Sequence, residues 1–295
     1  MSPLWIAAIG LGYLVFVAFL LLVVQPKSRS LRVDRIAHTV GLPLTDDIEP
    51  VVRGTQRAGV RMGFLSIAIG IVLATIYSLL RQVDSPIQVV WIDFTGVIAA
   101  AGIGNALATL VREDARQKHS VRVARLNAVS LSDYRSDFEQ WAPRLVVAIA
   151  LVGLAIRGAI YPLGYASVPP FLYVYAAVMV ASLLVYEIAS RALIRSGQPA
   201  SSELDLAWDD ALKSRALVGI ALAPLILGGY LGIAAWVFYP PTHSGATAIG
   251  SQIEIAFQFA GLALMLASIL ASSAAKSRTR YLRRLWPQLE GGAQP

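Results

Sequence analysis

The chain contains no cysteine among its 295 residues. This absence excludes disulfide bonds, thiolate metal sites and cysteine nucleophiles, although it does not fix the redox compartment. Histidine is scarce, because only His38, His119 and His243 occur and their positions show no metal-ligand spacing. Charged residues make up 15% of the chain, against roughly 25% in a soluble domain. A chain with so little charge is not expected to be an ordinary soluble protein.

Catalytic and nucleotide-binding motifs are also missing. The sequence has no Walker loop, dinucleotide glycine fingerprint, His-Glu-x-x-His helix or Gly-x-Ser-x-Gly elbow. Two adjacent acidic pairs, Asp46-Asp47 and Asp209-Asp210, raise the question of a divalent-metal site. Neighbouring side chains on a helix point about 100° apart, so neither pair is expected to converge on one ion. We therefore expect no enzyme activity, no metal and no cofactor.

Apolar residues, in contrast, are abundant: they make up 56% of the chain, and the mean hydropathy is +0.62. A membrane-spanning helix needs about 20 mostly apolar residues. Seven segments meet this requirement, namely residues 3–24, 60–80, 87–111, 143–161, 171–189, 216–238 and 250–275. The sequence therefore predicts an all-α integral membrane bundle of seven transmembrane helices, forming one domain over residues 1–295.

The distribution of Lys and Arg predicts the orientation of this bundle. Of the 25 Lys and Arg residues, 23 fall in or at the edges of alternate gaps between the segments, and only Arg81 and Arg157 do not. Short loops keep these residues on the cytoplasmic side, so the N-terminus is expected outside and the C-terminus in the cytoplasm of a multi-pass membrane protein. The first segment lacks a basic region before it, which suits an uncleaved anchor. Because the loops account for the +7 net charge, no nucleic-acid binding is expected.

The cytoplasmic segments carry signals for helices and for lipid contact. Their basic residues are expected to hold the inner surface against anionic inner-leaflet lipids. Capping-box patterns at residues 136–139 and 202–205 predict helix starts, and residues 205–215 should run as a helix into the sixth span. At the inner end of the fifth span, Glu187 and Arg191 have the spacing of a helix ion pair.

Residues 132–141 carry three aromatic side chains, Tyr134, Phe138 and Trp141, at i, i+4 and i+7. This spacing predicts one aromatic helical face lying in the membrane interface. Pro143 would then sit in the first turn of the fourth span. The alternative is a soluble loop helix that packs its aromatic side chains on neighbouring loops.

Two parts of the chain resemble each other. Residues 47–57 parallel residues 203–213, and one helix later Trp91-Ile-Asp93 parallels Gln252-Ile-Glu254. Residues 1–111 and 171–275 would then be two copies of one unit in the same orientation, with residues 143–161 as a linking helix. Parallel repeats of this 3+1+3 kind occur in transporters. The match is short and partly compositional, so duplication and chance similarity both stay open.

Four polar residues form the candidate binding site. Asp93, Arg157 and Glu254 are expected about 9, 7 and 6 Å below the outer ends of their spans. Gln258 lies one turn below Glu254 on the same face. Charged residues at such depth usually face the bundle interior and pair. The structural interpretation is a buried Asp93–Arg157 tie with Glu254 hydrated, and the functional one is an outward-open pocket for a proton, a cation or a small polar solute.

Small residues accompany these charges. Asp93 shares a helix face with Gly96, Ala100 and Gly104, a stripe that lets helices approach closely. In the sixth span, Pro224 precedes a Gly228-xxx-Gly232 pattern. A kink there could unwind the backbone toward a site, as in transporters. The simpler interpretation is a bent, tightly packed helix.

The amino-acid sequences of three cytoplasmic stretches also suggest a family. Residues 44–59, 131–134 and 205–215 resemble an uncharacterised family of polytopic membrane proteins of high-GC Gram-positive bacteria. The resemblance implies a bacterial plasma membrane and transfers neither activity nor site. We therefore hypothesise a non-enzymatic integral membrane protein, an accessory or partner subunit with a protein partner in the membrane. The alternative is a small transporter of a proton, cation or polar solute that uses the outer-leaflet polar site.

Overall fold

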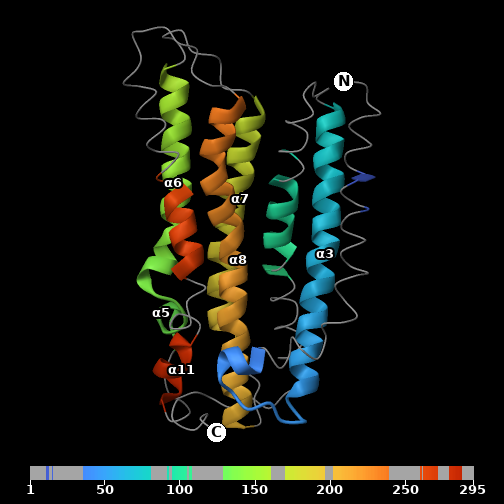
Figure 1. Cartoon of the computed structure of the whole chain (residues 1–295), viewed down its shortest axis with the longest axis vertical. Coiled ribbons are helices and arrows are strands. Elements are labelled where there is room, and N and C mark those ends of the chain that lie inside the picture. The colour runs from blue at the N-terminus through green and yellow to red at the C-terminus, as the bar shows by residue number, and fades with distance from the viewer. Residues whose placement is uncertain are drawn as a thin grey trace.

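The fold is known from a computed structural model, and the elements of its described part are all α-helices (Figure 1). This confirms the predicted all-α class. The structure describes residues 11–12, 15, 36–80, 92, 95–104, 106–107, 129–160, 170–196, 202–238, 260, 262–271 and 279–287. For residues 157, 160 and 232–238 it describes the backbone but not the side chain.

Four of these helices are long and apolar enough to cross a membrane, by length and composition. They are α3 (Glu49–Leu80), α6 (Asp137–Ile160), α7 (Pro170–Arg195) and α8 (Glu203–Phe238). They contain nearly all of the predicted spans 60–80, 143–161, 171–189 and 216–238.

Two shorter apolar helices, Thr95–Gly104 and Leu262–Ala271, cover parts of the predicted segments 87–111 and 250–275. The segment 3–24 lies almost wholly outside the described residues. The count of seven spans, their sidedness and the 3+1+3 repeat therefore stay predictions.

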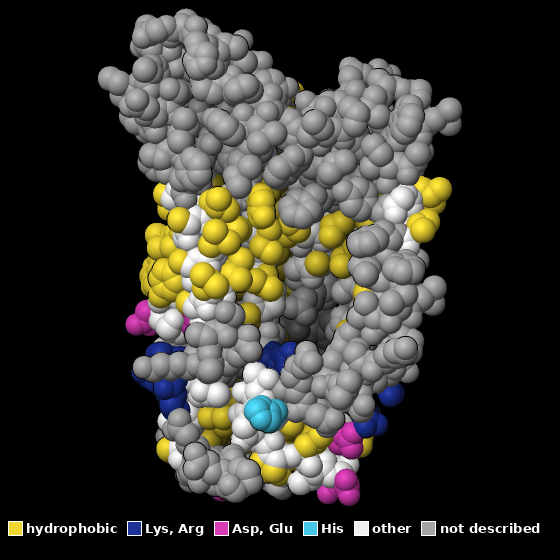
Figure 2. All heavy atoms as spheres, in the orientation of Figure 1, with side chains coloured by type: hydrophobic (Ala, Val, Ile, Leu, Met, Phe, Trp, Pro, Cys, Tyr) yellow, Lys and Arg dark blue, Asp and Glu magenta, His cyan; other side chains and the backbone are white. Residues whose placement is uncertain are grey.

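The long helices run side by side, and the short helices and polar helix ends lie together at one end of the bundle (Figure 1). The starts of α3, α6 and α8 and the end of α7 lie at this end, together with the short helices α5 (Leu131–Tyr134) and α11 (Arg280–Leu285). Figure 2 shows Lys and Arg side chains around it and an apolar belt above it. We call it the basic end.

Local hydrogen bonds decide where α6 and α8 begin. The Ser136 N–H donates to Oε2 of Glu139 over 2.8 Å, and the Glu139 N–H donates back to the Ser136 hydroxyl over 3.3 Å. This is the predicted capping box. At α8 the Asp205 N–H donates to the Ser202 hydroxyl over 3.2 Å, and the helix then runs unbroken from Glu203 into the apolar segment, as predicted.

The start of α6 corrects two expectations. Pro143 lies inside α6 rather than in its first turn, because the capping box starts the helix at Asp137. Tyr134 belongs to the separate helix α5, and the extended backbone at Arg135 separates the two helices. Tyr134 is therefore buried, whereas Phe138 and Trp141 are exposed, so the prediction of one aromatic face is wrong.

Helix α8 occupies the centre of the bundle, and glycines bring its neighbours close. A Cβ on Gly228 would lie 2.6 Å from Cγ1 of Val146 on α6. A Cβ on Gly229 would lie 2.8 Å from Cβ of Met265 in the helix Leu262–Ala271. The helix continues through Pro224 without a break. This agrees with the interpretation of a tightly packed helix and not with an unwound backbone.

The segment 36–48 folds onto the basic end of α8. A short helix over residues 36–40 stops at Gly41, whose φ of 73° favours glycine. The turn places the carbonyl of Pro43 where it accepts a hydrogen bond of 3.0 Å from Nε1 of Trp208. Ile36, Val40, Leu42 and Ile48 are consequently buried in the main core, which lies at this end.

Candidate functional site

The four residues of the predicted outer site cannot be placed together. Asp93, Glu254 and Gln258 lie outside the described residues. Arg157 belongs to α6, but its side chain is outside the description. The proposed pairing of Asp93 with Arg157 therefore stays a prediction.

The small-residue stripe that follows Asp93 in the sequence packs against α3. A close approach of helices was predicted for this stripe, but its partner helix was not. A Cβ on Gly96 would lie 2.7 Å from the carbonyl oxygen of Gly70 and 3.0 Å from Cβ of Ala74. A Cβ on Gly70 would collide with the Gly96 carbonyl and lie 2.6 Å from Cβ of Ala100. The helix Thr95–Gly104 and α3 therefore touch backbone to backbone.

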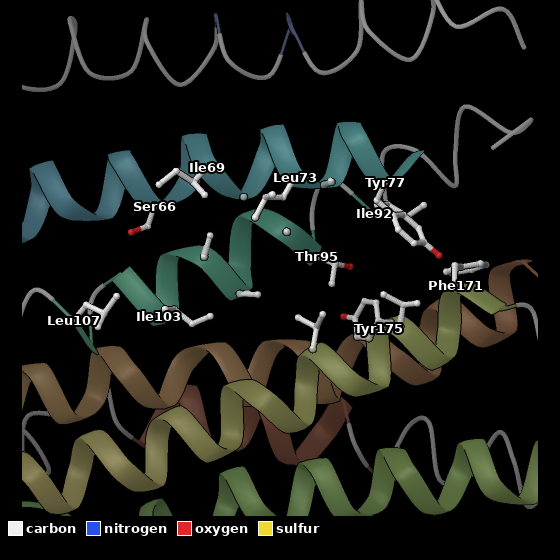
Figure 3. Close-up of a pocket in the computed structure, with 17 residues that line it drawn as sticks. Ser66, Ile69, Leu73, Tyr77, Ile92, Thr95, Ile103, Leu107, Phe171 and Tyr175 are labelled. Carbon is white, nitrogen blue, oxygen red and sulfur yellow. The ribbon is translucent and has the colours of Figure 1, made fainter. Parts of the chain in front are cut away.

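Between this helix pair and α7 lies a cavity of about 570 Å³ (Figure 3). Among the residues that the structure describes, seventeen line it, and none of these is charged. Figure 3 shows Tyr77, Ile92 and Phe171 at one end of the cavity and Ser66 and Leu107 at the other.

The wall of the cavity is hydrocarbon with few polar groups. Within the described lining, hydroxyl groups come from four residues, Ser66, Tyr77, Thr95 and Tyr175. Ile92 and Thr95, which flank Asp93 in the sequence, both line the cavity. Its lining suits an apolar occupant, since a polar ligand would leave its hydrogen-bonding groups unpaired.

At the basic end, a buried carboxylate joins three distant segments. Asp210 of α8 is fully buried; its Oδ1 accepts a hydrogen bond of 2.7 Å from the Tyr134 hydroxyl on α5. Its Oδ2 accepts one of 2.8 Å from Nε1 of Trp286, which follows α11. Two such donors stabilise a buried carboxylate that would otherwise be costly to desolvate.

Tyr281 of α11 lies near the same carboxylate. Burial raises the pKa of the Tyr281 hydroxyl, and the negative charge of Asp210 raises this pKa further, while Arg215 opposes the shift. The hydroxyl is buried without a hydrogen-bond partner in the described part of the chain. Tyr281 therefore stays neutral well beyond the pH at which a free tyrosine ionises.

The adjacent aspartates diverge, as expected for neighbours on a helix. Asp209 lies 3.5 Å from Nζ of Lys213, whereas Asp210 binds Tyr134 and Trp286. Among the described residues, no group of three or more His, Asp or Glu side chains could hold a metal ion. The Asp209–Asp210 pair thus has a structural use in this chain.

Two arginines fix the start of α6. The Arg135 side chain is 1% exposed, and its Nη1 lies 3.4 Å from the Tyr186 hydroxyl and 3.5 Å from the carbonyl oxygen of Leu217. Arg144 binds both carboxylate oxygens of Glu187, at 2.7 and 3.0 Å. These contacts hold the α5–α6 junction and α6 itself against α7 and α8.

The predicted Glu187–Arg191 ion pair is present at 3.4 Å, so Glu187 binds two arginines. Sequence reasoning found the local partner and missed Arg144, which lies 43 residues away. It also missed the role of Asp210. A signal was available, because Leu206, Asp210 and Leu217 share one helix face and an acidic residue in an apolar stripe is expected to have a buried partner.

No family model, no curated protein and no solved structure matches this chain.

Proposed function

We propose that the chain is a non-enzymatic, multi-pass protein of the plasma membrane that serves as an accessory subunit of a membrane complex. One observation carries this proposal. Charged side chains at the basic end, such as the buried Asp210 and the partly buried Glu187, bind segments of the chain to one another. The cavity that the described residues form is apolar. Such a molecule offers surfaces for contact rather than a polar reaction site.

The partner surface that we propose is the outer face of α6. Phe138, Trp141, Leu145 and Val152 are 42–57% exposed and lie within one face of the helix. The guanidinium of Arg144 lies 4.7 Å from the centre of the Trp141 ring, which orients the indole. A fixed aromatic residue beside an apolar stripe is typical of contact surfaces.

The test is site-specific photo-crosslinking in native membranes. A photoreactive residue at Leu145 should give one adduct of fixed mass with a second membrane protein. That protein should also co-purify with the untagged chain at a constant ratio. The control position is Leu184 on α7, which is 57% exposed and outside this face. If both positions gave only lipid adducts, and the chain migrated alone on native gels, the proposed role would be wrong.

A transporter remains the second candidate, because the cavity runs beside the residues that flank Asp93. In this proposal Asp93, Arg157 and Glu254 form a site for a proton, a cation or a small polar solute. Vesicles containing the purified chain should then show a flux that Asp93→Asn abolishes. Vesicles without any flux across a panel of protons, alkali cations and small solutes would reject it.

Sidedness belongs to the same proposal. We infer that the basic end faces the cytoplasm and that its Lys and Arg side chains bind anionic lipid headgroups, each contributing about 1 kcal/mol near the surface. A reporter fused after Pro295 should read cytoplasmic. A periplasmic or extracellular reading would reverse the orientation of the whole bundle.

A further inference from the structure

We propose that the cavity between α3, the helix Thr95–Gly104 and α7 binds one acyl chain of a phospholipid from the leaflet opposite the basic end. This goes beyond the accessory role, because it assigns a ligand to a site inside the bundle. The cavity measures about 570 Å³, and the described residues that line it are uncharged. Its size, its length and its depth in the bundle each favour an acyl chain.

The described lining disfavours polar ligands. Among the lining residues that the structure describes, only Ser66, Tyr77, Thr95 and Tyr175 carry a polar side-chain group, a hydroxyl in each case. An ion or a sugar would lose most of its hydrogen bonds with water and find few replacements. A hydrocarbon chain has no such groups to satisfy and gains from every methylene that it buries.

The cavity is too small to enclose a whole protein helix. A spanning helix about 10 Å wide and about 30 Å long fills roughly 2,400 Å³, several times the roughly 570 Å³ of the cavity. A methylene group takes up about as much space as a water molecule in the liquid, about 30 Å³. The volume of the cavity is therefore of the order that a single acyl chain needs.

The length and depth of the cavity match one leaflet. Its lining on α3 runs from Ser66 to Tyr77. Eleven residues of helix span about 16 Å. This is about half of the roughly 30 Å hydrocarbon layer. Tyr77 is three residues from the end of α3 at Leu80, whereas Ser66 is seventeen residues from its start at Glu49, so the cavity lies toward the end opposite the basic end.

A lipid can reach the cavity sideways. Leu73 of α3, Leu107 and Val174 of α7 line it and are 61%, 49% and 41% exposed. The inner wall is closed by buried Ala99 and Ala74 and by the Gly70–Gly96 contact. An acyl chain can thus enter from the hydrocarbon layer without crossing water. Tyr77 and Phe171 lie where its headgroup end would emerge (Figure 3).

The experiment uses the full chain in phosphatidylcholine vesicles that contain a phosphatidylcholine with a diazirine in one acyl chain. After illumination, the labelled residues are mapped by peptide mass spectrometry. We expect labelling of cavity residues that saturates at one lipid per chain. Native mass spectrometry of the purified chain should also retain one phospholipid.

Two matched variants separate the site from ordinary lipid contact. Val174→Trp places an indole in the cavity, whereas Val72→Trp makes the same change on α3 at a similarly exposed position that is not among the lining residues. Displacing two buried methylene groups lowers occupancy about tenfold, so Val174→Trp should reduce cavity labelling about tenfold or more. Val72→Trp should leave it unchanged. Leu73→Trp repeats the test from α3.

Two results would overturn the proposal. Labelling that never saturates, spreads over all apolar faces and is equal in the two valine variants would mean ordinary lipid contact only. Crosslinks from the cavity to a second protein or a second copy of the chain, with no lipid adduct, would mean that a protein covers the cavity. Size-exclusion profiles and helical circular dichroism of each variant check that the chain remains folded.

Discussion

Trp286 donates a hydrogen bond of 2.8 Å from its indole nitrogen to the carboxylate of Asp210, across 76 residues of chain. Tyr134 donates to the other carboxylate oxygen from 76 residues on the opposite side. One buried acidic side chain therefore joins α5, α8 and the segment after α11. The contact gives the basic end a fixed shape despite its many short segments.

Removing the indole donor should weaken this junction. Trp286→Phe keeps an aromatic ring but leaves Oδ2 of Asp210 without that hydrogen bond. The change should lower the free energy of unfolding by about 1–3 kcal/mol, as for a buried group that loses its partner. SDS titration in mixed micelles measures this value. Trp141→Phe is the control, because Trp141 is 57% exposed, and its effect should be close to zero.

Ionisation of Tyr281 should make the stability of the folded chain depend on pH. Its pKa is raised by burial first and by Asp210 second, so the folded state holds the proton more tightly than the unfolded state, in which tyrosine has a pKa of about 10. The stabilisation is complete below about pH 10 and declines as the pH rises from there toward the folded pKa.

Tyr281→Phe should flatten this decline between about pH 9 and 11. At neutral pH the same variant should be as stable as the parent chain or more stable, because it removes a buried hydroxyl that has no partner in the described structure. Melting temperature against pH checks both points. Tyr173→Phe is the control at an exposed position. An unchanged slope in Tyr281→Phe would assign the pH dependence to another group.

The Arg144–Glu187 contact should stabilise the packing of α6 on α7. The Arg144 and Glu187 side chains are 33% and 19% exposed, so solvent screens the pair, and a coupling of about 0.2–1 kcal/mol is expected. A double-mutant cycle with Arg144→Ala and Glu187→Gln measures it. The matching cycle with Arg191→Ala should give a smaller coupling, because Arg191 is 69% exposed and more distant.

Variants of Asp93 and Arg157 test whether these two side chains pair at the predicted outer site. If they pair inside the bundle, Arg157→Ala leaves an uncompensated charge and should cost about 3–5 kcal/mol of stability. Arg81→Ala, in a predicted outer loop, should cost little. The double change Asp93→Asn with Arg157→Gln should recover part of the loss, since the two amides can still bond. Equal stability of Arg157→Ala and the parent chain would reject the pairing.

Much of this fold could be predicted because its causes are local. Runs of about 20 apolar residues predicted α3, α6, α7 and α8, which are found as long apolar helices. The spacing of Gly96, Ala100 and Gly104 predicted a close helix contact, because small residues four apart form a flat face. The Ser136–Glu139 capping box involves only neighbouring residues and was likewise predicted.

Features set by distant contacts were missed. The aromatic spacing across residues 134–141 suggested one helix, but the Ser136 cap competes with that periodicity and starts a new helix. Asp210 has its partners 76 residues away in each direction. The cavity depends on how α7 sits against α3, which no pattern within either helix specifies.

Gly70 and Gly96 bring α3 and the helix Thr95–Gly104 into backbone contact, and this contact should tolerate no added side chain. A methyl group on Gly70 would collide with the Gly96 carbonyl and with Cβ of Ala100. Neither group can move away by a change of rotamer, so the two helices would have to separate. Gly70→Ala should therefore lower the free energy of unfolding by about 1–3 kcal/mol, the usual cost of overpacking.

Gly63→Ala is the matched control on the same helix, because nothing lies within 4 Å of the added carbon. It should be neutral or stabilising by up to about 1 kcal/mol, since alanine favours a helix over glycine. SDS titration of both variants gives the comparison. If Gly70→Ala were as stable as Gly63→Ala, the two helices would not touch at this point. The closed inner wall of the cavity, which depends on the same contact, would then be lost as well.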